Sequence, residues 1–168
     1  MQTIDPIFIE IFIKLFVALL LGAIIGTERF FAQKTAGIRT YALVSVGATL
    51  FVLISEVLAQ KYGGVGGFDP SRIASQIIVG IGFLGAGVII FHKEESRLVG
   101  LRTASGFWIT AGIGMATGFG FFQLAIIGTV LTLFIFVILH KLEDTLRKTK
   151  LYRDRHAQNE VREQSERE

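Results

Sequence analysis

The stretch LLLGAIIGTERFFAQKTAGIRTYALVSVGATLFVLIS, which runs from Leu19 to Ser55, decides the fold class. It joins two long apolar runs through one short polar connection, and a membrane-spanning helix needs about 20 such residues. Further apolar runs follow, and we place the five helices at about 6–26, 41–58, 73–91, 103–117 and 121–140. The fourth is short and rich in Gly, Ser and Thr, so we expect its neighbours to shield it. The sequence predicts an all-α, polytopic bundle of five transmembrane helices.

The composition of the whole chain agrees with a membrane protein and argues against several other classes. Of 168 residues, 51% are hydrophobic and 18% are charged, whereas soluble domains carry about 25% charged residues. The chain has 0 Cys, which excludes disulfides and Cys-ligated metal centres. No His, Ser and Asp pattern suggests catalysis, so we expect no enzymatic activity and no organic cofactor. Basic residues flank apolar runs instead of forming a basic face, which argues against nucleic acid as a partner.

The Lys and Arg residues indicate how the chain is oriented. Most of them fall in the connections after the first and third spans and in the tail after residue 140. Because cytoplasmic segments carry the excess of Lys and Arg, we expect the N-terminus outside and the C-terminus in the cytoplasm. No basic segment precedes the first span, so we expect this span to be retained. Residues 1–140 are expected to form the membrane domain, and residues 141–168 a charged cytoplasmic tail that is helical and then disordered.

The chain contains an internal duplication. The segments Leu21-Gly22-Ala23 and Gly37-Ile38-Arg39-Thr40 recur, at the same separation, as Leu84-Gly85-Ala86 and Gly100-Leu101-Arg102-Thr103. Asp5-Pro6 and Asp69-Pro70 open the two copies, since Asp caps a helix and Pro suits its first turn. Each copy holds two spans, so the copies run parallel, as they do in some transporters and in other duplicated bundles. Arg39 and Arg102 either anchor the topology or belong to a functional site.

Small residues on the predicted helices indicate close helix packing. The six candidates are Gly22, Gly26, Gly80, Gly82, Gly85 and Gly87. Gly80 to Gly85 also match the pattern G-x-G-x-x-G, but a dinucleotide site needs a strand before this motif and an acidic residue after it. Because the motif lies within a predicted span, nucleotide binding is not expected. The glycines of the third span could also line a path where the backbone approaches an ion.

Ionisable residues near the ends of the spans are the first candidates for a functional site. Glu10 and Lys14 are four residues apart on one helix face, which favours an ion pair. Glu28 closes the first span and could pair with Arg39 across the connection that follows. This pair is either a structural clamp or part of a gate or docking surface.

The outer ends of the spans are the second place where such residues gather. Polar residues begin the third span, namely Asp69, Arg72 and Gln76. The carboxyl groups predicted toward the outer side are those of Asp5, Glu10, Glu56 and Asp69. Mg²⁺ prefers oxygen ligands and retains several waters. Asp69 and Glu10 are therefore the candidate ligands of a Mg²⁺ ion, and capping or ion pairing is the alternative role of these carboxylates.

Three motifs carry a resemblance to a known family. They are Gly-Thr-Glu-Arg at 26–29, Ala-Gly-Ile-Arg-Thr at 36–40 and Gly-Ile-Gly-Phe-Leu-Gly-Ala-Gly at 80–87. In this order they resemble the membrane domain of the MgtC/SapB family, from about residue 15 to residue 120. Val99 and Arg102 differ from the residues that the family usually has around the Gly-Leu-Arg-Thr segment of the second copy, so no role tied to that loop is carried over. A charged tail, and not the soluble domain of better-known members, follows the fifth span here.

The resemblance implies a bacterial plasma-membrane protein that is linked to Mg²⁺ homeostasis at low Mg²⁺ and, in pathogens, to survival inside host cells. It also implies ATP synthase as a membrane partner. The positions that match the family are Glu28, Arg39, Asp69, Arg72 and Gln76, together with the glycines Gly80, Gly82, Gly85 and Gly87. The leading hypothesis is a non-enzymatic regulator of such a partner. The alternatives are a homo-oligomeric transporter or channel for Mg²⁺ or another cation, and a module whose basic tail acts on the bilayer.

Overall fold

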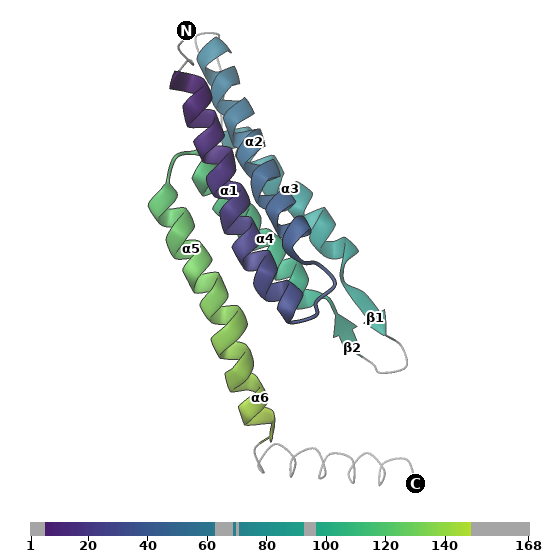
Figure 1. Ribbon diagram of the computed structural model, residues 1–168. Helices are drawn as coiled ribbons and strands as arrows, with labels where there is room; N and C mark the ends of the chain where they lie inside the picture. The colour runs from purple at the N-terminus through teal and green to yellow at the C-terminus, as the bar shows by residue number, and fades with distance from the viewer. Residues whose placement is uncertain (1–5, 63–68, 70, 93–96, 149–168) are drawn as a thin grey trace, which may run out of the picture. The chain divides into compact units, whose positions relative to one another are not determined.

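Helices form most of the computed structural model, which describes residues 6–62, 69, 71–92 and 97–148 (Figure 1). The four helices that come first are α1 (Pro6–Phe31), α2 (Ile38–Tyr62), α3 (Ser71–Gly87) and α4 (Leu101–Gly118). They are followed by α5 (Phe122–Phe134), the π-helical segment η1 (Ile135–Leu139) and α6 (His140–Lys148). Two short strands, β1 (Ile90–His92) and β2 (Arg97–Val99), connect α3 to α4. The all-α fold class predicted from the sequence is confirmed.

Three of the described helices are long and apolar enough to cross a membrane by themselves: Pro6–Phe31, Ile38–Tyr62 and Phe122–Glu143. Residues Arg72–Gly87 of α3 form a shorter apolar helix. More than half of the residues of α4 are buried, so neighbouring helices shield its Thr side chains and several of its glycines, as expected for the fourth predicted span. The chain divides into two compact units, Met1–Thr132 and Leu133–Glu168. The predicted division into residues 1–140 and 141–168 stays a prediction.

The third span ends earlier than the sequence predicts. We expected it to continue to Phe91, but α3 ends at Gly87 and β1 begins at Ile90. β1 pairs antiparallel with β2, with Ile90 opposite Val99 and Phe91 opposite Leu98. An uninterrupted apolar run cannot by itself distinguish a helix from a strand, and β-branched and aromatic residues favour the strand. The prediction of helix over 88–91 is therefore wrong, and a hairpin takes its place.

The interior of the first unit lies where α1, α2 and α4 approach one another closely. A Cβ atom added to Gly22 of α1 would lie 2.7 Å from the carbonyl oxygen of Tyr41, and one added to Gly118 of α4 would lie 2.7 Å from Cβ of Val52. The ring of Tyr41 packs edge-on against Phe107 of α4, with centroids 5.3 Å apart. These contacts advance in the same direction along α2 and α4, so the two helices run parallel.

The packing repeats between the two copies of the duplication. Gly22 faces Tyr41 in the first copy, and Gly85 faces Ala104 at the equivalent position of the second copy, 3.5 Å from an added Cβ to Cβ of Ala104. The next close contact lies at the equivalent place in both copies, but different residues make it. In the first copy a Cβ added to Gly26 would meet the backbone of Ile38 and Gly37, whereas in the second copy one added to Gly100 would meet the backbone of Val88 and Ile89. The loop glycine is thus present in both copies, as Gly37 and Gly100, whereas the helix glycine is present only in the first, because Ile89 stands at the position equivalent to Gly26.

Candidate functional site

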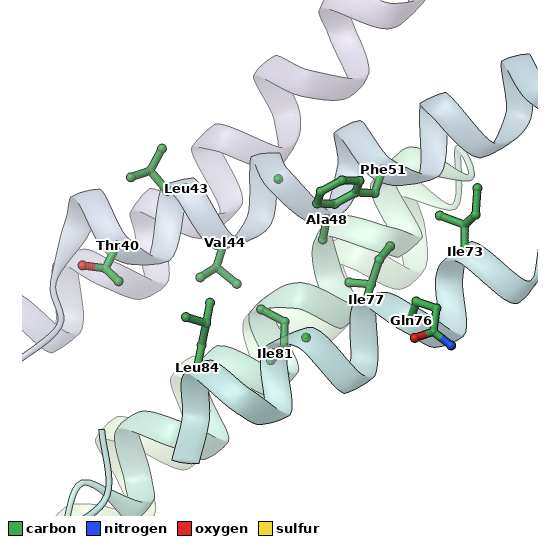
Figure 2. Close-up of a pocket in the computed structure, with 12 residues that line it drawn as sticks. Thr40, Leu43, Val44, Ala48, Phe51, Ile73, Gln76, Ile77, Ile81 and Leu84 are labelled. Carbon is green, nitrogen blue, oxygen red and sulfur yellow. The ribbon is translucent and has the colours of Figure 1, made fainter. Parts of the chain in front are cut away.

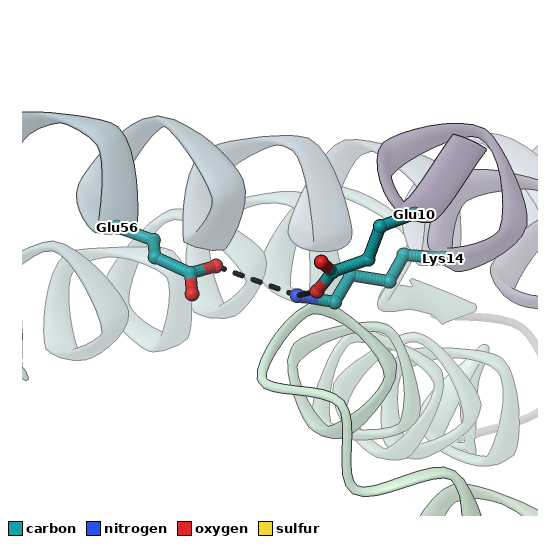
Figure 3. A network of polar contacts seen from close by, with 3 residues as sticks. All are labelled: Glu10, Lys14 and Glu56. Atoms are coloured by element: carbon teal, nitrogen blue, oxygen red, sulfur yellow. Dashed lines mark hydrogen bonds and ion pairs between the residues drawn. The ribbon is translucent and has the colours of Figure 1, made fainter. Parts of the chain in front are cut away.

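A charged cluster lies toward the N-terminal end of α1 and joins it to α2 (Figure 3). Nζ of Lys14 lies 2.8 Å from Oε1 of Glu10 and 3.4 Å from Oε2 of Glu56. Lys14 is only 5% exposed, and a buried ammonium group without a counter-charge costs several kcal/mol. The two carboxylates therefore hold the Lys14 charge in place. The predicted ion pair between Glu10 and Lys14 is present, with Glu56 as a further partner that the sequence did not indicate.

This cluster opens into a cavity of about 540 Å³ beside the connection between α4 and α5. Glu10, Lys14 and Glu56 line it together with Phe119 and Gly120. In the part of the chain that the structure describes, no group of three His, Cys, Asp or Glu side chains is arranged to hold a metal ion. The carboxylate of Glu10, a candidate Mg²⁺ ligand, is engaged by Lys14. Its role in metal binding stays a prediction.

The start of α3 holds three further candidates from the sequence. The carbonyl oxygen of Asp69 accepts a hydrogen bond from the backbone N–H of Arg72 at 3.2 Å, which closes the first turn of the helix. The carbonyl oxygen of Arg72 in turn accepts a hydrogen bond from Oγ of Ser75 at 2.8 Å. Gln76 lies on the next turn and is exposed. Asp5 and Pro70, the other members of the two predicted Asp-Pro caps, lie outside the described residues.

At the C-terminal end of α1, the expected pairing of Glu28 with Arg39 is wrong. The carboxylate of Glu28 accepts a hydrogen bond from Nε of Arg29, its neighbour in the chain. Arg29 is 2% exposed, whereas Arg39 is exposed on the first turn of α2.

Arg29 is the charged residue that the sequence reasoning missed. The predicted first span ends at residue 26 and leaves Arg29 in the connection that follows, although Arg29 continues a helical face. The buried residues of α1 are Lys14, Ala18, Gly22, Ile25, Gly26 and Arg29, which recur at intervals of three or four. This spacing defines one face of a helix. The small residues of this face were visible in the sequence, and extending them by one turn in each direction identifies both buried cations.

A groove runs between α2 and α3 and brings together two other candidates (Figure 2). Its volume is about 720 Å³. The α2 side consists of Thr40, Leu43, Val44, Gly47, Ala48 and Phe51, and the α3 side of Ile73, Gln76, Ile77, Gly80, Ile81 and Leu84. Gln76 and Gly80 therefore share one site. Arg39 is next to the groove residue Thr40 in the chain, and the exposed Arg102 lies on the first turn of α4.

The six candidate glycines divide into two groups. Gly22, Gly26 and Gly85 lie at helix contacts, where an added Cβ would meet atoms of the neighbouring helix or of the chain next to it. A Cβ added to Gly80, Gly82 or Gly87 would have no atom of the described chain within 4 Å, apart from its own helix. The first group therefore allows helices to pack closely. The second group leaves the backbone of part of α3 uncovered by side chains.

The family model described as the MgtC family matches residues 15–145. The chain belongs to the MgtC family. The match includes the fifth predicted span, which the motifs alone did not cover, and all residues of the groove between α2 and α3. It begins just after Lys14, so Glu10 and Lys14 lie outside it. Family membership and the three long apolar helices together identify this MgtC-family chain as a membrane protein.

Relatives of this MgtC-family chain share more than 40% of its residues where they align. The putative magnesium transporter YhiD of Escherichia coli K12 is 42% identical over 123 residues, which is 70% of this chain and 55% of YhiD. An uncharacterized protein of Haemophilus influenzae is 44% identical over 115 residues, 67% of this chain and 48% of the relative. Protein MgtC of Salmonella typhimurium LT2 is 46% identical over 112 residues, 67% of this chain and 45% of the relative.

The chain thus spans about half the length of the curated relatives that it matches. No solved structure matches it.

Proposed function

We propose that this chain is a non-enzymatic regulator in the bacterial plasma membrane that acts in Mg²⁺ homeostasis by binding another membrane complex. Membership of the MgtC family supports the link to Mg²⁺, as does the description of the relative YhiD as a putative magnesium transporter. ATP synthase is the partner that we propose, and adaptation to low Mg²⁺ and survival inside host cells are the settings. The chain is oriented with its N-terminus outside and its C-terminus in the cytoplasm.

The distribution of charge along the helices carries this proposal. Long stretches in the middle of the helices contain no Asp, Glu, Lys, Arg or His, namely 15–27, 42–55, 73–87, 103–118 and 122–139. Proteins that carry ions or protons across a membrane usually keep ionisable groups near its centre. Here the ionisable groups lie toward the helix ends, in the Lys14 cluster and in the Glu28–Arg29 pair. Binding a partner requires no such central group.

The test is isolation of the chain with its neighbours from native membranes of cells grown at low Mg²⁺. We expect subunits of ATP synthase to be recovered and proton-driven ATP synthesis in inverted vesicles to fall when the chain is present. Gly82→Leu fills an exposed part of α3 where an added Cβ meets nothing within 4 Å, so this variant should fold and lose the partner if α3 forms the interface. Recovery of no partner together with unchanged ATP synthesis would contradict the proposal.

A homo-oligomeric transporter or channel for Mg²⁺ or another cation is the second candidate. The cavity beside Glu10 and Glu56 favours it, because two carboxylates at a cavity could receive an entering cation. Mg²⁺ influx into proteoliposomes with a trapped dye tests it, with Glu10→Gln and Asp69→Asn beside the unchanged chain. Saturable influx that falls in these variants would establish transport and overturn the regulator. No influx above that of empty liposomes, with protein shown to be folded, would remove the transporter.

A further inference from the structure

The groove between α2 and α3 is long and narrow. Figure 2 shows Thr40 and Leu84 at one end and Phe51 and Ile73 at the other. Eleven helical steps separate Thr40 from Phe51, which corresponds to about 16 Å at the rise of an α-helix. Half of the hydrocarbon core of a bilayer is about 15 Å thick. The groove is therefore about as long as the apolar part of one leaflet.

The groove has room because glycines stand on both of its sides. A Cβ atom added to Gly47 of α2 or to Gly80 of α3 would have no atom within 4 Å in the described chain outside its own helix. The groove has a volume of about 720 Å³ and is lined almost entirely by apolar side chains. An extended acyl chain matches both the apolar lining and the length of about 16 Å.

A basic residue lies on the same turn of α2 as one end of the groove. Arg39 precedes the lining residue Thr40 and is exposed. Within the part of the chain that the structure describes, no carboxylate pairs with Arg39. A guanidinium group binds phosphate through two parallel hydrogen bonds. A phosphate group bound by Arg39 would therefore lie at the same end of α2 as the groove residue Thr40.

The same end has the character of a membrane surface. Leu84 lies on the last turn of α3, and the hairpin that follows exposes the apolar side chains of Ile90, Phe91 and Leu98. Exposed apolar side chains next to Arg residues are typical of the boundary between hydrocarbon and headgroups. The groove thus begins at a polar boundary and runs inward along α2.

From these observations we infer that the groove is a binding site for an anionic phospholipid, with one acyl chain between α2 and α3 and the phosphate on Arg39. Gly47 and Gly80 admit the acyl chain, and Thr40 stands at the entrance. The site does not depend on the proposed regulatory function, since a lipid could bind there whichever protein the chain contacts.

Native mass spectrometry of the full chain, extracted from vesicles of phosphatidylglycerol and phosphatidylethanolamine, tests this site. We expect a phosphatidylglycerol molecule to stay bound to the unchanged protein. Gly80→Leu places a side chain in the groove and should abolish this binding. Gly112→Leu is the matched control, because a Cβ added to Gly112 of α4 also meets nothing within 4 Å and Gly112 does not line the groove.

The headgroup is tested by Arg39→Gln with Lys34→Gln as its matched control. A basic residue at the membrane surface is worth about a fivefold preference for an anionic lipid, so Arg39→Gln should lower the preference for phosphatidylglycerol by about this factor. Lys34 is exposed in the connection before α2, further along the chain from the groove, so its replacement should lower the preference by less than that of Arg39.

Three results would overturn the site. They are an unchanged protein that retains no lipid, a Gly80→Leu variant that retains as much lipid as Gly112→Leu, and equal preferences in the Arg39→Gln and Lys34→Gln variants. A fourth result would overturn it as well: a dimer that Gly80→Leu dissociates without a change in bound lipid, which would assign the groove to a second copy of the chain.

Discussion

Lys14 shows how a single buried charge depends on two partners. Its ammonium group contacts Glu10 and Glu56, so either carboxylate alone still leaves a counter-charge. We expect Glu10→Gln and Glu56→Gln each to lower the free energy of unfolding by less than about 1 kcal/mol, because both carboxylates are partly exposed. The double variant should lose about 3 kcal/mol, since it leaves a buried, unpaired ammonium group.

Thermal unfolding of the four proteins in detergent gives this double-mutant cycle. Adding Lys14→Met to the double variant removes the unpaired charge and should restore most of the lost stability. Losses that simply add, or a third substitution that restores nothing, would show that burial of Lys14 carries no such penalty.

Gly22 is the second residue whose role can be tested by a small change. In Gly22→Ala the new methyl group would lie 2.7 Å from the carbonyl oxygen of Tyr41, and forcing extra atoms into such a contact costs about 1–3 kcal/mol. Gly112→Ala is the control, because it meets nothing within 4 Å and Ala favours a helix over Gly by up to about 1 kcal/mol. We expect the first variant to unfold at a lower temperature and the second to match or exceed the unchanged chain. Equal stability of the two would contradict the close packing of α1 on α2.

Part of this residue-level arrangement is visible in the sequence. The pair of Glu10 with Lys14 follows from helical spacing alone. Glu56 could not be assigned to it, because that contact depends on how α2 packs against α1 and not on separation along the chain. The burial of Arg29 could have been predicted, since Arg29 continues the helix face of Gly22 and Gly26.

At the scale of the elements, the two copies of the duplication differ most where a helix ends. In the first copy α1 continues to Phe31, whereas in the second α3 stops at Gly87 and a hairpin follows. The sequence predicts the duplicated unit correctly, because the Leu-Gly-Ala and Gly-φ-Arg-Thr segments repeat. It does not predict the hairpin, since Val88 to Phe91 are apolar and suit either a helix or a strand.

Gly100 and Gly37, which are equivalent in the two copies, should respond differently to replacement. Gly100 has φ of 98°, and an added Cβ would collide with the carbonyl group of Val88, whereas Gly37 meets only Phe30 at 3.6 Å. A left-handed backbone costs a residue other than Gly about 1–2 kcal/mol, and the collision adds to this. We expect Gly100→Ala to lower stability by about 2–4 kcal/mol and Gly37→Ala by less than about 0.5 kcal/mol. Similar unfolding temperatures for the two variants would contradict the hairpin geometry.

At the scale of the whole molecule, the class of the fold could be predicted from the sequence, because a bilayer imposes a length on every spanning helix. The run lengths identified α1, α2 and the helix from Phe122 without ambiguity. The groove between α2 and α3 could not be predicted from the sequence, although the sequence places Gln76 and Gly80 on one helix. Its other side comes from α2, and only the packing of the two helices shows that Gly47 and Gly80 leave a space between them.

The orientation of the chain is the last prediction, and the composition makes it simple to test. Arg29, Lys34 and Arg39 lie in or beside the connection between α1 and α2, so Lys34 is expected in the cytoplasm and Lys61, at the far end of α2, outside. Because the chain has 0 Cys, Lys34→Cys and Lys61→Cys each introduce a unique thiol at an exposed position. In intact cells a membrane-impermeant maleimide should label Lys61→Cys only, and permeabilised cells should allow both to react. The opposite pattern would invert the topology and move the acyl-chain groove, whose entrance lies beside Arg39, to the outer leaflet.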